Sequence, residues 1–288
     1  MNTSIEYPTD WTEYELIDSG DGGKLERFGQ YRLVRPDPRA LWGRLLPAEV
    51  WDSANATYWR ADLKSGEWEV KFPPPSPWLV RYHKITFRLR PTEFKHVGVF
   101  PEQAVNWNWL EKIIAGRPLN ILNLFAYTGG ATMTALASGA RVTHVDASKG
   151  ALTWANENLK ASKLDTKPIR WIQEDVHKFV LREEKRGNTY DGIIMDPPRF
   201  GRGSKGEVWK LENDLPKLIA SCRKILAPKP AFVLVNAYTA DMSALVLHNM
   251  LTSSMNDLGG SISFGELAIK ESTSDRLLPN GIFARWLK

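Results

Sequence analysis

The residues whose types and spacing most directly suggest chemistry are DPPRF at positions 196–200, which follow an apolar run from 190 to 195. Two consecutive prolines fix the backbone and remove two hydrogen-bond donors, so their carbonyl groups and the Asp196 carboxylate are expected to remain available as acceptors. Such acceptors could hold an exocyclic amine or the edge of a nucleobase, and Phe200 could stack on a base that has left its helix. A turn that merely ends a strand would explain the prolines but not the pairing of an acid with an aromatic side chain.

The elements that must position these residues are visible from residue 95 onward, where apolar runs alternate with helical patterns. Alternating strands and helices predict a parallel sheet with helices on both faces, that is, a doubly wound α/β fold. We expect strands at 120–125, 141–145, 169–172, 190–195 and 232–235, helices at 131–138, 149–161 and 211–226, and a closing antiparallel hairpin of 262–269 and 282–287 around the turn Pro279-Asn280-Gly281.

Residues 1–93 are predicted to form a separate, small, mainly β domain before the larger domain of residues 94–288. Short alternating stretches recur there, and six of the twelve tryptophans lie before residue 80. From 84 to 90 the side chains alternate strictly, with apolar residues on one side and basic or polar residues on the other. The tryptophans could stack on bases, but such residues more often fill a β core.

Ligands of a doubly wound sheet bind at the carboxyl ends of its strands, so we compared the residues that follow each strand. Gly129 and Gly130, after the first strand, allow the backbone to approach a ligand at a helix N-terminus, without the G-x-G-x-x-G spacing of dinucleotide binders. Asp146 after the second strand could accept both hydroxyls of a ribose, and Asp175 after the third could meet a base. Each of these acids could instead cap a helix. Together the three strand ends describe a slot shaped for a nucleoside.

The composition excludes several classes of protein. A net charge of +5 and a pI near 9.2 permit a polyanionic partner without requiring one. One cysteine excludes a disulfide framework and a cysteine-based zinc cluster, and the five histidines show no metal-ligand spacing, so no metal is expected. No apolar run approaches the roughly 18 residues of a membrane span, and the first residues lack the apolar core of a signal peptide. We therefore expect a cytoplasmic protein with no membrane partner.

The stretches LNLFAYTGGATMTALASGARVTHVDAS (122–148) and DPPRF (196–200) resemble the class I S-adenosylmethionine-dependent methyltransferases, which have a Rossmann-like sheet. The similarity is greatest to the large-subunit ribosomal RNA methyltransferases that modify carbon-5 of cytosine or, in relatives, guanine nitrogens. FKHVGVFPEQ (94–103) resembles the segment that precedes the catalytic domain in this group. The resemblance spans roughly residues 94–240. It implies the cofactor S-adenosyl-L-methionine and an RNA substrate, here expected to be ribosomal RNA.

Carried over position by position, the resemblance implies roles for individual residues. Residues 126–129 would line the methionine part of the cofactor, Asp146 would bind its ribose, and Asp175 its adenine amine. The catalytic set would be Asp196 beside the transferring methyl group, together with Pro197, Phe200 and Asn236. The cofactor-binding residues lie at the strand ends and in the preceding segment; they are Phe100, Gln103, Ala126, Tyr127, Thr128, Gly129, Asp146, Ala147, Ser148, Asp175, Val176 and Asp196.

The sequence departs from this group at the residue that decides the chemistry. Carbon-5 of cytosine becomes nucleophilic only after a cysteine adds to the neighbouring ring carbon. In the group that cysteine follows the fifth strand, where this sequence has Asn236 and Ala237. The only cysteine, Cys222, falls on the apolar stripe of a helix and is expected in the core. We therefore expect direct transfer to a nitrogen, which needs orientation and acceptors rather than a covalent intermediate.

Basic residues around the DPPRF turn favour an RNA substrate. Arg199, Arg202 and Lys205 are expected to bind it, together with the basic face of the strand at 84–90, and residues 201–206 could form a loop that orders over the substrate. A run of charge is often only a solvated surface, so a methyltransferase acting on a protein or small molecule and a non-catalytic RNA-binding relative remain alternatives. A nicotinamide dehydrogenase shares the sheet but would need a third glycine. The β domain could also pair subunits into a homodimer.

Overall fold

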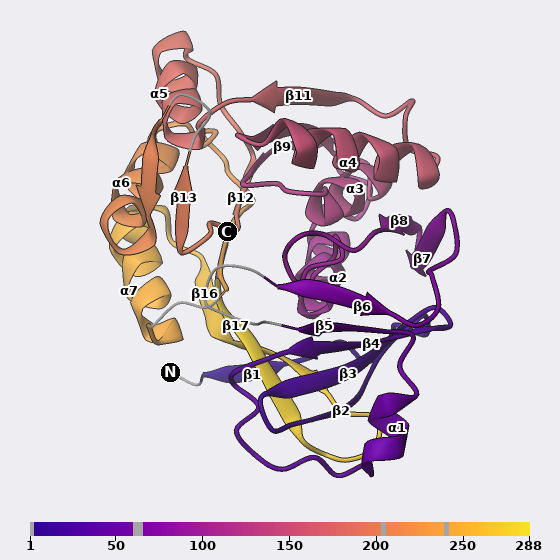
Figure 1. Cartoon of the computed structure of the whole chain (residues 1–288). Coiled ribbons are helices and arrows are strands. Elements are labelled where there is room, and N and C mark those ends of the chain that lie inside the picture. The colour runs from indigo at the N-terminus through magenta and orange to yellow at the C-terminus, as the bar shows by residue number, and fades with distance from the viewer. Residues whose placement is uncertain (1–2, 60–65, 203–205, 239–241) are drawn as a thin grey trace. The chain divides into compact units, whose positions relative to one another are not determined.

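The computed structural model describes residues 3–59, 66–202, 206–238 and 242–288, and the chain divides into two compact units (Figure 1). The first unit comprises the residues up to Glu6, Val105–Leu267 and Asn280–Lys288, and the second comprises Tyr7–Ala104 and Ala268–Pro279. The last two strands of the chain therefore contribute residues to both units. The sequence predicts a division between residues 93 and 94 instead, and that domain boundary stays a prediction.

The first unit is built on an eight-stranded sheet in the order β1-β16-β17-β15-β12-β9-β10-β11. Strands β15, β12, β9, β10 and β11 run parallel to one another, and β17 runs antiparallel to β15. Apolar residues fill these strands because helices bury both faces of a parallel sheet. The strands are β1 (Ser4–Glu6), β9 (Asn120–Leu124), β10 (Arg141–Asp146), β11 (Ile169–Gln173), β12 (Gly192–Met195), β15 (Phe232–Ala237), β16 (Ser261–Lys270) and β17 (Leu277–Leu287), with the small pair β13 (Phe200–Arg202) and β14 (Val208–Lys210) beside them.

Helices cover both faces of this sheet, which confirms the predicted doubly wound α/β fold. Helices α5, α6 and α7 pack side by side on one face, and α2, α3 and α4 lie on the other (Figure 1). The core beneath α5, α6 and α7 includes Phe179, Leu215, Leu218 and Val233, all fully buried. The helices are α2 (Ala104–Ile114), α3 (Gly130–Ala137), α4 (Lys149–Ala161), α5 (Val176–Arg186), α6 (Leu211–Lys224), α7 (Ala244–Met255) and the 3-10 turn η2 (Asn256–Leu258).

Among the described residues, every helix is too short or too polar to cross a lipid bilayer.

The closing hairpin forms, but its turn is not where the sequence analysis placed it. Pro279-Asn280-Gly281 lies inside β17, and the chain reverses at Glu271–Arg276, where the Glu271 amide donates to the Arg276 carbonyl oxygen at 3.0 Å. The prediction was wrong because a proline-glycine signal outweighed the polar run SerThrSerAsp at 272–275, which is equally typical of a turn. Both hairpin strands are consequently longer than predicted.

The second unit is a small, β-rich body, as predicted for the N-terminal part of the chain. It contains a five-stranded sheet in the order β2-β3-β4-β5-β6 and a two-stranded sheet of β7 and β8. Trp11, Trp51 and Trp78 are buried in it, so these tryptophans fill the core, whereas Trp59 is 60% exposed. Its elements are β2 (Tyr14–Gly20), β3 (Gly23–Phe28), β4 (Tyr31–Pro36), α1 (Ala48–Asp52), β5 (Ala56–Trp59), β6 (Glu67–Val70), β7 (Trp78–Tyr82), β8 (Ile85–Leu89) and η1 (Pro101–Gln103).

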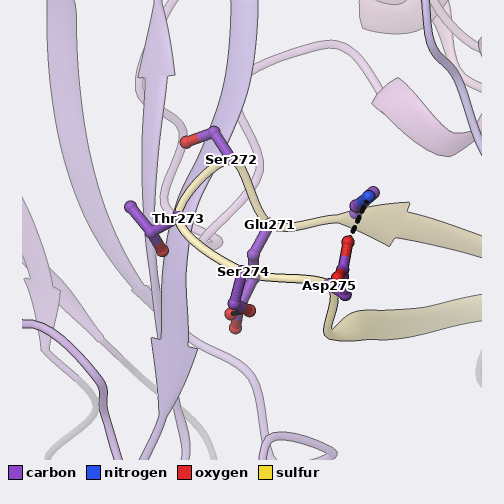
Figure 2. Close-up of a pocket in the computed structure, with 6 residues that line it drawn as sticks. Glu271, Ser272, Thr273, Ser274 and Asp275 are labelled. Atoms are coloured by element: carbon purple, nitrogen blue, oxygen red, sulfur yellow. Dashed lines mark hydrogen bonds and ion pairs between the residues drawn. The ribbon is translucent and has the colours of Figure 1, made fainter.

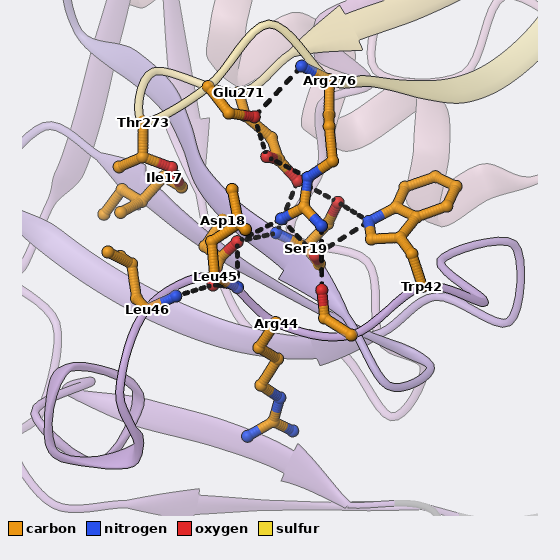
Figure 3. Close-up of polar contacts among 12 residues, drawn as sticks. Ile17, Asp18, Ser19, Trp42, Arg44, Leu45, Leu46, Glu271, Thr273 and Arg276 are labelled. Atoms are coloured by element: carbon orange, nitrogen blue, oxygen red, sulfur yellow. Dashed lines mark hydrogen bonds and ion pairs between the residues drawn. The ribbon is translucent and has the colours of Figure 1, made fainter.

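The tip of the β16–β17 hairpin belongs to this second unit and is fastened there by a buried ionic cluster (Figure 3). Arg276 donates to Asp18 and to Glu271, each at 2.8 Å, and both carboxylates are buried. Asp18 also accepts from the Trp51 indole and the Leu46 amide, each at 3.0 Å. Residues 270–275 of the tip line a pocket where Lys270 and the exposed Asp275 form an ion pair (Figure 2). The tip thus contains a cluster of two ion pairs with buried carboxylates and one exposed ion pair.

Candidate active site at the strand ends

The turn after β9 is held in an unusual backbone conformation. Phe125, Tyr127 and Gly129 have positive φ angles of 55°, 47° and 88°, and the first two are not glycine, so the turn stores backbone strain. Hydrogen bonds from the Ala126 amide to Val145 and from the Asn158 side chain to the Thr128 carbonyl hold it in place. The turn leads directly into α3, whose N-terminus presents backbone amides to a ligand. The predicted cofactor-binding residues 126–129 therefore form one rigid loop.

Glycine is required at positions 129 and 130 for different structural reasons. Gly129 needs its left-handed φ, and a Cβ there would lie 3.3 Å from the Ala155 Cβ. At Gly130 a Cβ would lie only 2.5 Å from the Trp107 ring, so this glycine is required by helix α2. The packing against Trp107 accounts for this glycine, and its expected role in ligand approach stays a prediction.

Substituting Gly130 with alanine should therefore destabilise the protein, by about 1–3 kcal/mol as in other overpacked cores. Denaturant unfolding would measure the loss. Gly150→Ala is the matched control, since the nearest atom to a Cβ there is the Ser148 Oγ at 3.7 Å. In the helix α4 this second change should stabilise by about 0.5–1 kcal/mol. Equal unfolding midpoints for the two variants would contradict the packing role of Trp107.

A row of hydrogen-bonded, buried polar side chains supports the loop 126–129 and was not predicted from the sequence. The Asn123 amide donates to the Thr132 hydroxyl oxygen at 2.9 Å, and Thr132 lies 2.9 Å from the His144 Nδ1. Burial lowers the pKa of His144 to about 3, so this imidazole stays neutral at physiological pH. Because the Thr132 oxygen already accepts a hydrogen bond, its own hydrogen can be donated to Nδ1. This row thereby ties the middle of β9, the start of α3 and β10 together.

Asp146 lies at the end of β10, and its carboxylate is held by the neighbouring backbone. One oxygen accepts from the Tyr127 amide at 2.9 Å and the other from the Ser148 amide at 2.8 Å. Ser148, not Asp146, is the N-cap of α4, since its hydroxyl accepts from the Ala151 amide. Burial raises the pKa of Asp146 despite these two hydrogen bonds. Each carboxylate oxygen can still accept a second hydrogen bond, as a ribose diol would require.

Asp175 is the N-cap of α5, so the capping role that was the alternative to contact with a base is present. Its Oδ1 accepts from the Lys178 amide at 2.9 Å, and the following Val176 is buried. The second carboxylate oxygen of Asp175 is not used in this cap, so capping and adenine binding are compatible. Its contact with the cofactor stays a prediction.

Asp196 is the acid with the most perturbed environment at the strand ends. The residue follows β12 and is half-buried, and burial raises the pKa of its carboxyl group to about 7. Among the residues that the structure describes, no side chain or amide donates a hydrogen bond to this carboxylate and no cation offsets its charge. A carboxylate that is poised near neutral pH and lacks a protein partner is typical of a functional group rather than a structural one.

The DPPRF turn is braced by Trp209, which the sequence analysis did not identify. The Trp209 indole donates to the Pro198 carbonyl oxygen at 2.7 Å, and its ring lies 4.8 Å from that of Phe125. The expectation that both proline carbonyls stay free was therefore wrong for Pro198. Pro197 is buried, and Phe200 is 53% exposed in β13.

The predicted substrate-binding residues have different outcomes. Arg199 is exposed and lies 3.6 Å from Glu212, so part of its charge is already compensated. Arg202 ends β13, whose partner strand is β14, and this pairing occupies part of the predicted loop 201–206. Lys205 lies outside the described residues. Binding of substrate by these three residues stays a prediction.

Asn236 lies at the end of β15 within a buried polar network. Its Oδ1 accepts from the Asn106 amide at 2.7 Å, and the Asn106 oxygen accepts from Arg285 at 2.7 and 2.9 Å. Arg285 also donates to Glu6 at 2.9 Å. This arrangement fixes the Asn236 oxygen toward Asn106 and leaves its amide N–H groups as the part that can face a ligand.

Two of the cofactor candidates, Phe100 and Gln103, belong to the second unit. Phe100 precedes η1, its ring lies 4.9 Å from that of His96, and Gln103 is buried at the end of the same turn. Their predicted contact with the cofactor stays a prediction. Among the described residues, no cluster of three or more histidine, cysteine or acidic side chains is arranged to hold a metal ion.

The sequence profile of a family described as S-adenosylmethionine-dependent methyltransferases matches residues 56–240. The chain belongs to this family. A crystal structure of the SAM-dependent methyltransferase from Agrobacterium tumefaciens is 45% identical, covers 99% of this chain and 93% of its own, and superimposes with a TM-score of 0.94. The protein SMU.776, solved in complex with SAH, shares only the fold, with a TM-score of 0.73 at 19% identity over 97% of this chain and 76% of its own.

Curated relatives of this methyltransferase are similar over shorter stretches. The ribosomal RNA large subunit methyltransferase K/L of Hahella chejuensis is 34% identical over 151 residues, which is 52% of this chain and 20% of that protein. The ribosomal RNA large subunit methyltransferase I of Cronobacter sakazakii is 42% identical over 81 residues, 28% of this chain and 20% of that protein. The methyltransferase thus matches about a fifth of the length of each of these relatives.

The strand ends of the methyltransferase fit its cofactor, S-adenosylmethionine. Asp146 retains acceptor capacity for a ribose, and the rigid loop 126–129 lies beside it through the Tyr127–Asp146 hydrogen bond. The carboxylate of Asp196 has no partner among the described side chains. These features come from three neighbouring parallel strands, β10, β9 and β12, whose carboxyl ends share one edge of the sheet.

Proposed function

We propose that this methyltransferase modifies a nitrogen atom of a base in ribosomal RNA. Two curated relatives carry names that specify ribosomal RNA of the large subunit. The exposed Phe200 and Arg199, which follow Asp196 within four residues of the sequence, suit a base and its phosphate better than a small metabolite. The proposal places the protein in the cytoplasm, where ribosomal RNA is found.

The observation that carries the nitrogen assignment is the position of the single cysteine. Cys222 lies inside α6 within the apolar core, 1% exposed, and burial raises the pKa of its thiol well above the ordinary range. A thiol that cannot ionise or reach the strand ends cannot add to a pyrimidine ring. Asn236 and Ala237 occupy the end of β15. Covalent activation of a pyrimidine carbon therefore has no nucleophile of the required kind in this chain.

A nitrogen needs no such activation, because its lone pair attacks directly. S-adenosylmethionine, when bound, supplies a methyl group made electrophilic by its sulfonium. The chain's own residues orient the target: Asp196 accepts a hydrogen bond from the exocyclic amine, and the Asn236 amide donates to a neighbouring acceptor of the base. As the N–C bond forms and the C–S electron pair stays on sulfur, the nitrogen must lose a proton. The Asp196 carboxylate, with a pKa near 7, can take it.

The decisive experiment is nucleoside mass spectrometry after incubating unmodified ribosomal RNA with the protein and isotopically labelled S-adenosylmethionine. We expect the label on a guanine or adenine nitrogen. Labelled 5-methylcytosine would overturn the nitrogen assignment, and absence of label from protein that binds the cofactor would redirect the substrate to an assembled particle, a protein or a metabolite. The same assay with peptide and small-molecule pools would identify which of these applies.

Substitution of Cys222 supplies an independent check. We expect Cys222→Ala to keep the turnover number of the wild type, because the thiol only fills the core. The smaller side chain should lower the unfolding midpoint slightly through the cavity that it leaves. Loss of turnover in a Cys222→Ala protein that remains folded and binds cofactor would show that the thiol does take part in the chemistry.

A further inference from the structure

One segment of the second unit, which contains the hairpin β7–β8, has a net charge equal to that of the whole chain. Between Glu69 and Glu93 the sequence holds five lysine or arginine residues and no acid. The whole chain has 38 basic and 33 acidic residues, an excess that is also five. The remainder of the chain is therefore neutral in sum, and this segment accounts for the net charge.

The hairpin presents these cations on one face. Its inner face consists of alternate residues that are at most 3% exposed, namely Trp78, Val80, Tyr82, Ile85, Phe87 and Leu89. On the outer face, the strand register sets Leu79 opposite Arg88 and Arg81 opposite Thr86. Both arginines are exposed, as are Lys84 in the turn and Arg90 beyond β8. Because same-face residues on a strand lie about 6.6–6.8 Å apart, these cations form a row rather than a single point of charge.

Two acids of the preceding segment, Asp10 and Glu13, contact the hairpin. Asp10 accepts from the Tyr82 hydroxyl at 2.9 Å and lies 3.1 Å from the His83 Nε2. The Glu13 carboxylate accepts from the backbone amide of Arg81 at 2.7 Å. These contacts fix the hairpin while the strand between Lys84 and Arg90 carries no acid of its own.

We infer that the outer face of β7–β8 binds the phosphate backbone of the RNA substrate, an inference that rests on the proposed function. The buried aromatic face anchors the hairpin, so its cations are held on a rigid element. A row of cations matches a chain of repeated phosphates, whereas a metabolite offers only one or two charges. Contacts of this kind supply affinity and position the substrate without reading its sequence. Recognition of the base would then be left to the strand ends of the first unit.

The test neutralises the face and follows RNA binding as a function of salt. The variant Arg81→Gln/Arg88→Gln/Arg90→Gln keeps the polar outer face of the hairpin. The matched control, Lys160→Gln/Lys163→Gln/Lys167→Gln, removes the same charge from exposed lysines at the end of α4. With unmodified ribosomal RNA at about 100 mM salt, we expect the hairpin variant to bind on the order of tenfold to a hundredfold more weakly. Its salt slope should fall by about two to three, since each phosphate contact contributes about 0.7–0.9.

The outcomes separate this inference from the proposed function. A higher KM for RNA with unchanged kcat in the hairpin variant, and wild-type behaviour in the control, supports both. If the wild type methylates RNA and the two variants share its affinity and salt slope, the proposed RNA-binding surface is wrong, whereas the proposed function is unaffected. If both variants weaken equally, only net charge matters and the surface is again wrong. If the wild type binds no RNA but modifies an acidic protein or a metabolite, both the proposed function and the proposed RNA-binding surface are wrong.

Discussion

Replacing Asp196 with asparagine should reduce kcat for methyl transfer by about 10²–10⁴-fold, the range over which a positioned proton acceptor contributes. Asparagine keeps an oxygen that can accept a hydrogen bond from the target amine, but it cannot take up the proton that the amine loses. The affinity for S-adenosylmethionine should fall much less than kcat, because Asp196 is only one of the predicted cofactor contacts and the ribose and adenine positions on β10 and α5 are untouched. Rapid-quench assays with labelled cofactor and calorimetric titration of its binding would measure the two effects separately.

The pH dependence of the wild type gives a second readout of the same group. The active form is the carboxylate, and the pKa of Asp196 is raised to about 7, so kcat/KM should rise through pH 7 and level off above about pH 8. Asp191→Asn, the same chemical change at the opposite end of β12, is the control and should keep this profile. Full activity of Asp196→Asn at pH 8 would show that Asp196 does not accept the proton.

The contribution of Asp196 to the free energy of unfolding should depend on pH in the opposite sense to that of an ordinary carboxylate, whose pKa is lowered by folding. The native state binds the Asp196 proton more tightly than the unfolded state, whose pKa is near the ordinary value of 3.8. The group therefore destabilises the fold increasingly as pH rises from about 4 to 7. Asp196→Asn removes that cost, so its gain in unfolding midpoint over the wild type should be larger at pH 8 than at pH 5. A group retained despite such a cost is one that serves function.

Local signals in the sequence predicted the parallel strands of the large sheet and the helices α3, α4 and α6, but not α2, α5 or α7. The chemistry expected at the strand ends stays a prediction. The helix predicted at 149–161 matches α4 because its serine cap and apolar stripe are both local. Cys222 was expected in the core because the 3.6-residue periodicity of α6 places it on the apolar face. Asp146 and Asp196 were found because each directly follows a strand, where the carboxyl edge of a parallel sheet collects ligands.

The features that the sequence analysis missed depend on partners distant in the chain. Trp107 dictates Gly130 from the preceding helix, and no pattern around the glycine indicates a ring at that position. The contact between Arg285 and Asn106 spans 179 residues, and it decides which side of the Asn236 amide is available to a ligand. The Trp209 indole donates a hydrogen bond to the Pro198 carbonyl oxygen, which was expected to stay available as an acceptor. Residue type and spacing predict where a polar group lies, but only the packing determines which of its atoms are already occupied.

The other large effect that we expect is on stability, from Arg276. Substituting Arg276→Met keeps the aliphatic stem but removes the only cation that contacts both Asp18 and Glu271 in the part of the chain that the structure describes. Both carboxylate side chains are fully buried. Breaking a buried pair leaves an uncompensated charge and typically costs about 3–5 kcal/mol. Urea unfolding monitored by tryptophan fluorescence would report the loss, since Trp42 and Trp51 contact the same cluster.

The same hairpin tip contains a matched control. Lys270, six residues before Arg276, forms an ion pair with the exposed acid Asp275. The Asp275 side chain is 98% exposed, so Lys270→Met should leave the unfolding midpoint nearly unchanged. Adding Glu271→Gln to Arg276→Met should recover part of the loss, since it removes one of the two stranded charges and keeps an acceptor for Ser19. Similar midpoints for Lys270→Met and Arg276→Met would mean that water or neighbouring amides compensate the buried carboxylates. A large loss for Arg276→Met alone would identify the buried cluster, rather than the exposed ion pair, as the part of the tip that contributes to stability.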